Sequence, residues 1–337
     1  MPISSSNRRG AMFSLGAFTL YSSHDVIVKT LGGQYAPFQI LFFSVLFGFP
    51  LVMLLLIRDT HAATLIPRHP WWMALRTAVV VVVGVCVFYA FSVLPLAQAY
   101  AIIFMMPFLI TILSIPILGE KVGPRRWGAI IVGLIGVVVV IRPGGETLTL
   151  GHAAAVTGAA LGALASVIVR KIGAEERSAV LLIYPMMANI VAMAIALPFV
   201  YEPMPFVDLA LVAALSALAF CGGLFMIAAY RAGDAAIVAP MQYSQIIWAA
   251  VFGYVFFGET VDRLTWLGAA IIISSGVYIV LREASGGRST TMPVLSENTR
   301  RPEVGTMPRI SSLLRVMGKD HGKAPNRDQS RVFADDK

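Results

Sequence analysis

The sequence contains little charge, little cysteine and no recognisable set of metal ligands. Asp, Glu, Lys and Arg make up 13% of its 337 residues, whereas a soluble domain carries about 25%. The two cysteines, Cys86 and Cys221, both lie inside apolar runs, which predicts packing residues rather than a disulfide or a metal site. The five histidines are scattered without the spacing of ligands. We therefore expect a membrane protein with no bound metal and no cofactor.

The sequence also lacks a constellation of catalytic residues. There is no cluster of His with Asp, no Cys/His pair and no Ser in a nucleophile turn, so an enzyme is not expected. The net charge of +8 belongs to loops and to the C-terminal segment. Lys and Arg are common in the cytoplasmic segments of membrane proteins, so this charge does not indicate nucleic acid.

Long apolar runs dominate what is present. The chain is 58% hydrophobic with a mean hydropathy of +0.79, and about 20 apolar residues suffice for one membrane-spanning helix. The runs predict an all-α polytopic membrane protein, embedded in the lipid bilayer, with ten transmembrane helices. We place them at residues 11–30, 36–57, 72–92, 97–118, 126–141, 151–170, 179–200, 207–229, 236–257 and 265–282.

The distribution of Lys and Arg predicts the orientation. With the N-terminus inside, twelve of these residues fall in cytoplasmic segments before the tail and three in outer loops. This bias favours the inner membrane with both termini cytoplasmic. Residues 284–337 lack periodicity and are rich in Ser, Thr, Pro and Arg, which predicts a disordered cytoplasmic tail.

Two halves of the chain repeat each other. "DVIVKTLG" at residues 25–32 returns as "SVIVRKIG" 141 residues later, and the Gly-Glu of "PILGEKVGPRRWGAIIVGLIGVVVVIRP" returns 139 residues later in "YVFFGETVDRLTWLGAAIIISSGVYIVLRE". The repeats are expected at residues 11–141 and 151–283, with five helices each. Because five is odd, the second half enters the membrane from the other side. Inverted repeats predict a secondary transporter that works by alternating access; the alternative of another class is a membrane scaffold without transport.

The chain resembles the EamA-type drug/metabolite transporters. The two long Gly-Glu segments quoted above carry the resemblance, which covers roughly residues 10–283. It implies a carrier of a small organic metabolite. More narrowly, "SSHDVIVKTLG" and "DAAIVAPMQYSQIIWAAVFGYVFFGE" are similar to bacterial members that import riboflavin or S-adenosylmethionine. Riboflavin uptake is the leading expectation, with S-adenosylmethionine uptake and amino-acid or drug export as alternatives.

The ionisable group His24, Asp25 and Lys29 in the first helix is the first candidate substrate site. Asp25 lies about 22 Å along that helix at 1.5 Å per residue, inside the apolar slab, where a central Asp costs about 2.5–3.5 kcal/mol. Asp25 must therefore face a partner or a wet cavity. One reading is a structural pair with Lys29, four residues further on. The other is a substrate or proton site, and we expect the functional role.

The ninth helix supplies the second candidate site, in "MQYSQIIW". Gln242 and Gln245 are spaced to share one helix face, and Tyr243 and Trp248 add flat rings. The repeat maps Tyr243 onto Phe104, and Tyr100 lies one turn before Phe104. Amides with aromatic rings suit a flat heteroaromatic ligand. The alternative is ordinary packing with an aromatic belt.

Two further features are interpreted as structural. Glu120 and Glu259 are expected to cap the start of the helix that follows each of them. The fifth and tenth helices carry small residues and no ionisable group inside, which predicts support helices or the seam of a homodimer.

Overall fold

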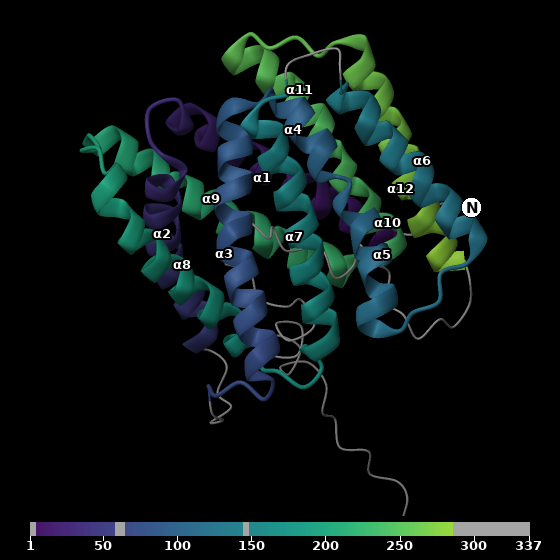
Figure 1. The fold of residues 1–337 in the computed structure, drawn as a ribbon, viewed down its shortest axis with the longest axis horizontal. Helices are drawn as coiled ribbons and strands as arrows, with labels where there is room; N and C mark the ends of the chain where they lie inside the picture. The colour runs from purple at the N-terminus through teal and green to yellow at the C-terminus, as the bar shows by residue number, and fades with distance from the viewer. Residues whose placement is uncertain (1–4, 58–64, 144–147, 286–337) are drawn as a thin grey trace, which may run out of the picture.

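A computed structural model of the chain describes residues 5–57, 65–143 and 148–285. Figure 1 shows these residues as a bundle of long helices that run side by side. Of the predicted tail at residues 284–337, the structure describes residues 284 and 285, which end the last helix. The remainder of the tail lies outside the described residues.

The ten predicted transmembrane helices are confirmed, and two of them are broken. The fourth consists of α4 and α5, and the ninth of α10, the 3-10 helix η1 and α11. Among the described residues, eight segments are long and apolar enough to cross a membrane on their own; the other two are α1, which carries Asp25 and Lys29, and the divided ninth. The bounds are α1 (Ser5–Gly32), α2 (Pro37–Ile57), α3 (Pro70–Val93), α4 (Leu96–Ile103), α5 (Met106–Leu118), α6 (Pro124–Ile141), α7 (Leu150–Ile172), α8 (Ser178–Val200), α9 (Phe206–Ala232), α10 (Ala235–Val238), η1 (Ala239–Tyr243), α11 (Ser244–Phe257) and α12 (Arg263–Ser285).

The two breaks fall at equivalent places in the two repeats. Phe104 follows the end of α4 and Tyr243 ends η1, and these residues are 139 positions apart. Pro107 lies in the first turn of α5, and Pro240 lies inside η1. A proline has no N–H to donate and disturbs the preceding helical turn, so each break has a local cause in the sequence.

The Gly-Glu motif ends a helix in both repeats. Gly119 and Gly258 adopt left-handed backbone conformations with φ of 73° and 65°, which side chains with a Cβ disfavour. The N–H of Glu120 bonds the carbonyl of Ser114, and the N–H of Glu259 bonds that of Gly253. The N–H of each glycine bonds the carbonyl four residues earlier, that of Ile115 or Tyr254, so both are αL-type ends, and they turn the two glutamates away from the helix axis in equivalent ways.

The two repeats pack on each other reciprocally. The first helix of each repeat packs along the third helix of the other, so that α1 lies against α9 and α7 lies against α3. The helices α2 and α8 lie together on one flank, and α6 and α12 on the opposite flank (Figure 1). The largest hydrophobic core contains residues from both repeats. The broken spans lie between these helices: α4 packs against α7 and α11, and α11 packs against α1.

The fifth and tenth helices form a seam inside the chain. A Cβ added at Gly268 would lie 2.7 Å from the carbonyl oxygen of Gly136, so α6 and α12 approach closely only because both residues are glycine. This supports the expected role as support helices. The outer face of α6 still exposes Ile131, Val132 and Ile135, and a homodimer through this flank stays a prediction.

Candidate functional site

Asp25 lies in the interior of the bundle, with 1% of its surface exposed. One carboxylate oxygen accepts a hydrogen bond from the hydroxyl of Tyr100, which comes from α4. The other lies 2.9 Å from Nδ1 of His24, the preceding residue of α1. Burial of a carboxylate is costly unless charged or polar groups surround it, and the fold provides those groups from two spans.

A third span extends this hydrogen-bonded chain. The amide Nε2 of Gln245 in α11 donates to the hydroxyl oxygen of Tyr100 at 3.2 Å. Tyr100 thus accepts from Gln245 and donates to Asp25. Because a hydroxyl has one proton to donate and lone pairs to accept with, the direction of this chain fixes the Tyr100 proton toward the carboxylate.

Aromatic rings flank the polar chain. The ring of Tyr100 lies 5.1 Å from that of Phe91 and 5.8 Å from that of Phe104, measured between centroids. Phe104 meets Tyr243 edge-on at 5.3 Å. Phe104 and Tyr243 are repeat counterparts, so the expected mapping brings two equivalent residues into direct contact at the two helix breaks. The predicted residues His24, Asp25, Tyr100, Phe104, Tyr243 and Gln245 thus form one cluster, called the Asp25 cluster below.

The polar part of the Asp25 cluster has no equivalent at the counterpart positions of the two repeats. The repeat counterparts of Asp25, Tyr100 and Gln245 are Ser166, Ala239 and Met106. The hydroxyl of Ser166 bonds the carbonyl of Gly162 in its own helix, at 2.9 Å. Although the helices of the two repeats are equivalent, the polar groups at the centre are not.

The alternative reading, a structural pair of Asp25 with Lys29, is not what the contacts of Lys29 show. The ammonium of Lys29 donates to Glu259 instead, and also to the backbone carbonyl of Leu94 at 2.5 Å. Its Nζ lies 5.2 Å from the ring centroid of Phe257. Lys29 is one turn beyond Asp25 toward the end of α1, and its long side chain reaches outward to the glutamate rather than back to the aspartate.

The other two predicted residues are Gln242 and Trp248. Gln242 is half-buried in η1, and Trp248 packs with Phe252 along α11 at 5.5 Å between ring centroids. The helix changes from 3-10 to α between Gln242 and Gln245. The α-helical spacing on which their shared face was predicted therefore does not hold across this boundary: Gln245 bonds Tyr100, whereas Gln242 adjoins Tyr243.

The predicted capping role of Glu120 and Glu259 is wrong. The helix after Glu120 is α6, whose N-cap is Gly123, and the carboxylate of Glu120 accepts a hydrogen bond from Arg170 in α7 instead. The helix after Glu259 is α12, where Asp262 accepts the N–H groups of Leu264 and Thr265 at 2.9 and 3.3 Å. Glu259 instead accepts the N–H of Leu96, at the start of α4 in the other repeat, at 3.0 Å.

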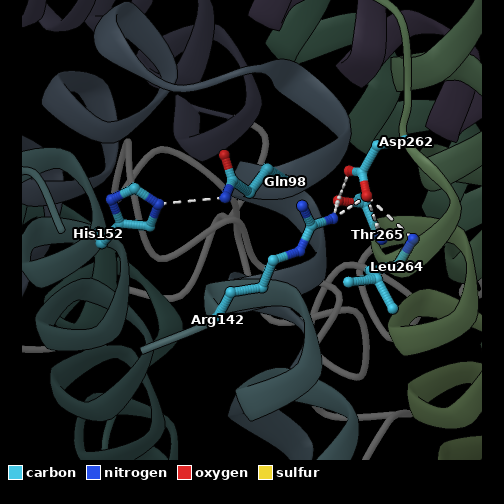
Figure 2. Close-up of polar contacts among 6 residues, drawn as sticks. All are labelled: Gln98, Arg142, His152, Asp262, Leu264 and Thr265. Carbon is cyan, nitrogen blue, oxygen red and sulfur yellow. Dashed lines mark hydrogen bonds and ion pairs between the residues drawn. The ribbon is translucent and has the colours of Figure 1, made fainter. Parts of the chain in front are cut away.

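A cavity of about 180 Å³ lies beside Glu259, smaller than the roughly 300–1,000 Å³ of most ligand pockets. Figure 2 shows the polar residues around it: the amide of Gln98 meets His152 at 3.1 Å, and the guanidinium of Arg142 reaches Asp262 and Thr265. These contacts join positions 54 to 123 residues apart, so no local pattern in the sequence predicts them.

The chemistry of the Asp25 cluster suits binding rather than catalysis. Within the described residues, no group of three His, Cys, Asp or Glu side chains could hold a metal ion. A buried carboxylate, an imidazole and an amide can complement charge and hydrogen-bonding groups, and the rings next to them can hold a flat or cationic group.

Comparisons with known proteins agree with this picture. The EamA-like transporter family matches the chain twice, at residues 8–142 and 149–282. An S-adenosylmethionine uptake transporter of Rickettsia felis is 27% identical over 263 residues, covering 78% of this chain and 89% of that protein. A riboflavin transporter of Rhizobium johnstonii is 29% identical over 219 residues, covering 64% of this chain and 72% of that protein.

A solved crystal structure has the same fold. It matches with a TM-score of 0.56 at 18% identity, covering 83% of this chain and 100% of the other, which shows a common fold alone. The family match, the apolar helices and the transporter relatives together describe a multi-pass membrane transporter of small metabolites, and not an enzyme. The chain belongs to the EamA-like transporter family.

Proposed function

We propose that the chain takes up a cationic metabolite that carries a flat ring, with S-adenosylmethionine as the favoured substrate. The observation that carries the proposal is Asp25, a carboxylate that is 1% exposed in the middle of the bundle and bordered by aromatic rings. A sulfonium group would complement the carboxylate and lie against the ring faces. An adenine ring would stack on the same aromatic surfaces.

The position of Lys29 supports a cationic substrate. Its ammonium binds Glu259 and the carbonyl of Leu94, so the contacts of Asp25 are with the neighbouring His24 and Tyr100. A relative that takes up S-adenosylmethionine is similar over 89% of its own length. These two lines agree on a positively charged ligand, one from the site and one from a relative.

Riboflavin is the second candidate, because a specific feature favours it. Gln245, Phe104 and Tyr243 offer an amide and two rings to a neutral isoalloxazine-like ring system, and a riboflavin transporter is among the relatives. A flavin makes no use of a buried negative charge, so the two substrates differ in their dependence on Asp25. Export of an amino acid or drug by the same fold is the remaining alternative.

Ligand-dependent thermal stability of the purified full-length protein separates these substrates. A bound ligand raises the apparent Tm in proportion to RT ln(1 + [L]/Kd). We expect S-adenosylmethionine to raise it, Asp25→Asn to abolish that rise, and the counterpart substitution Ser166→Ala to preserve it. A rise with riboflavin that persists in Asp25→Asn would establish the flavin instead. Uptake into proteoliposomes then distinguishes a carrier from a scaffold, since a scaffold gives no substrate-dependent flux.

The proposal includes the orientation inferred from the basic residues. It has the chain in the inner membrane with both termini cytoplasmic, so the loop after Gly258 faces outward and the loop after Gly119 faces the cytoplasm. Reporter fusions after residues 123 and 262 test this: we expect a cytoplasmic signal from the first and an external signal from the second. The reverse pair of signals would contradict the proposed orientation, because it would place both termini outside the cytoplasm.

A further inference from the structure

Two ion pairs join the repeats to each other. Lys29 of the first repeat donates to Glu259 of the second, and Arg170 of the second donates to Glu120 of the first. Their burial is nearly the same, with exposures of 10% and 20% in the first pair and 8% and 18% in the second. Each pair therefore links a first helix to the Gly-Glu turn of the other repeat.

The two ion pairs are counterparts of each other. Lys29 and Arg170 occupy the same place in the repeated phrases "DVIVKTLG" and "SVIVRKIG", and the two glutamates occupy the same place in the two Gly-Glu motifs. The left-handed glycine before each glutamate gives both turns the same course. The same contact thus occurs twice, with Lys and Arg exchanged, whereas the polar residues Asp25, Tyr100 and Gln245 of the Asp25 cluster have different residues at their counterpart positions.

The two ion pairs lie at opposite ends of one membrane span. Glu259 accepts the N–H of Leu96, the first residue of α4, and Glu120 follows the C-cap of α5. The span between them contains 23 residues, about 34 Å at 1.5 Å per residue. Tyr100, which holds Asp25, lies one turn inside Leu96, so the Lys29–Glu259 pair covers the cluster from the nearer end.

We propose that these ion pairs are the two closures of the transport path, and that each must break for its own end to open. The inference rests on the proposed transport function, but it does not depend on the identity of the substrate. In inverted repeats the two halves exchange conformations during the cycle. Two equivalent contacts at opposite ends then break alternately, and water replaces each partner at moderate cost because the pairs are partly exposed.

Accessibility of a single cysteine tests this inference without any substrate. The reporter is Ala97→Cys in full-length protein that carries Cys86→Ala and Cys221→Ala. Ala97 is 3% exposed and lies beside Glu259 at the cavity. The rate of labelling by a membrane-impermeant maleimide, added to either face of sealed vesicles, reports opening at that end. We expect Lys29→Gln to raise the rate severalfold and Arg170→Gln to lower it.

The repeats themselves supply the matched controls. Lys29→Arg and Arg170→Lys each install the residue that the other repeat uses, and both should keep the labelling rate of the reference protein. Glu259→Gln removes the partner of Lys29 and should raise the labelling rate, and Glu120→Gln removes the partner of Arg170 and should lower it. Agreement between the two variants of each ion pair excludes misfolding of one variant as the cause. A labelling rate that shifts in the same direction for the variants of both ion pairs, or that shifts for neither, would overturn the inference. Failure of S-adenosylmethionine to bind would leave these rates unaffected.

Discussion

The ends of the molecule and its centre obey different symmetries. At the ends, a basic residue of one repeat binds a glutamate of the other, and this contact occurs twice. At the centre, Asp25, Tyr100 and Gln245 form a polar chain, whereas their counterparts are Ser166, Ala239 and Met106. Motion between two equivalent halves requires equivalent contacts, while a small metabolite has no two-fold axis. We infer that the symmetric parts serve the conformational cycle and the asymmetric part serves the ligand.

The largest effect is expected at the asymmetric centre. Tyr100→Phe removes the hydroxyl that links Gln245 to Asp25 but keeps the ring. A hydrogen bond to a charged group contributes about 1.5–3 kcal/mol, so substrate affinity should fall by roughly 10- to 100-fold. Ala239 is the repeat counterpart of Tyr100. Its substitution Ala239→Ser should alter affinity little, because the counterpart of Asp25 is Ser166, which has no carboxylate to accept a hydrogen bond. Titration of the purified variants measures both, and an equal loss in the two would break the comparison.

An intermediate effect, equal at both ends, is expected in the Gly-Glu turns. Gly119→Ala and Gly258→Ala each force a Cβ into a left-handed backbone with φ of 73° or 65°. The strain amounts to about 1–2 kcal/mol per residue. A Cβ at either glycine meets nothing within 4 Å, so the strain is the only penalty and the two variants should lose similar amounts of apparent Tm. A large difference between them would show that the two turns are not equivalent.

The smallest effect is expected from the ion pairs themselves. A double-mutant cycle of Lys29→Gln with Glu259→Gln should give a coupling energy on the order of 1 kcal/mol, as partly exposed pairs do. The cycle of Arg170→Gln with Glu120→Gln should give a similar value, and both should shrink at high salt. Denaturation of the four single and two double variants provides the numbers. Coupling at one end alone would mean that only one closure exists.

The sequence predicts most of the fold, because each of the ten spans requires an apolar run and the repeated phrases identify the two five-helix halves. It also identifies six members of the Asp25 cluster by residue type. The contact of Lys29 could not be predicted from its local spacing to Asp25, because Glu259 is 230 residues away. The equivalence of Lys29 with Arg170, and of the two Gly-Glu motifs, was the signal for both ion pairs. The helix type changes after Tyr243, so the relative direction of Gln242 and Gln245 could not be predicted from α-helical spacing.

The central claim is that counterparts are interchangeable at the ends and not at the centre. Uptake by two exchange variants at equal expression measures this most directly. The variant with Lys29→Arg and Arg170→Lys should keep most of the uptake, because each end retains its ion pair. The variant with Asp25→Ser and Ser166→Asp should lose it, because the moved carboxylate no longer meets Tyr100. Uptake by the second variant at the level of the unmodified protein would contradict the account.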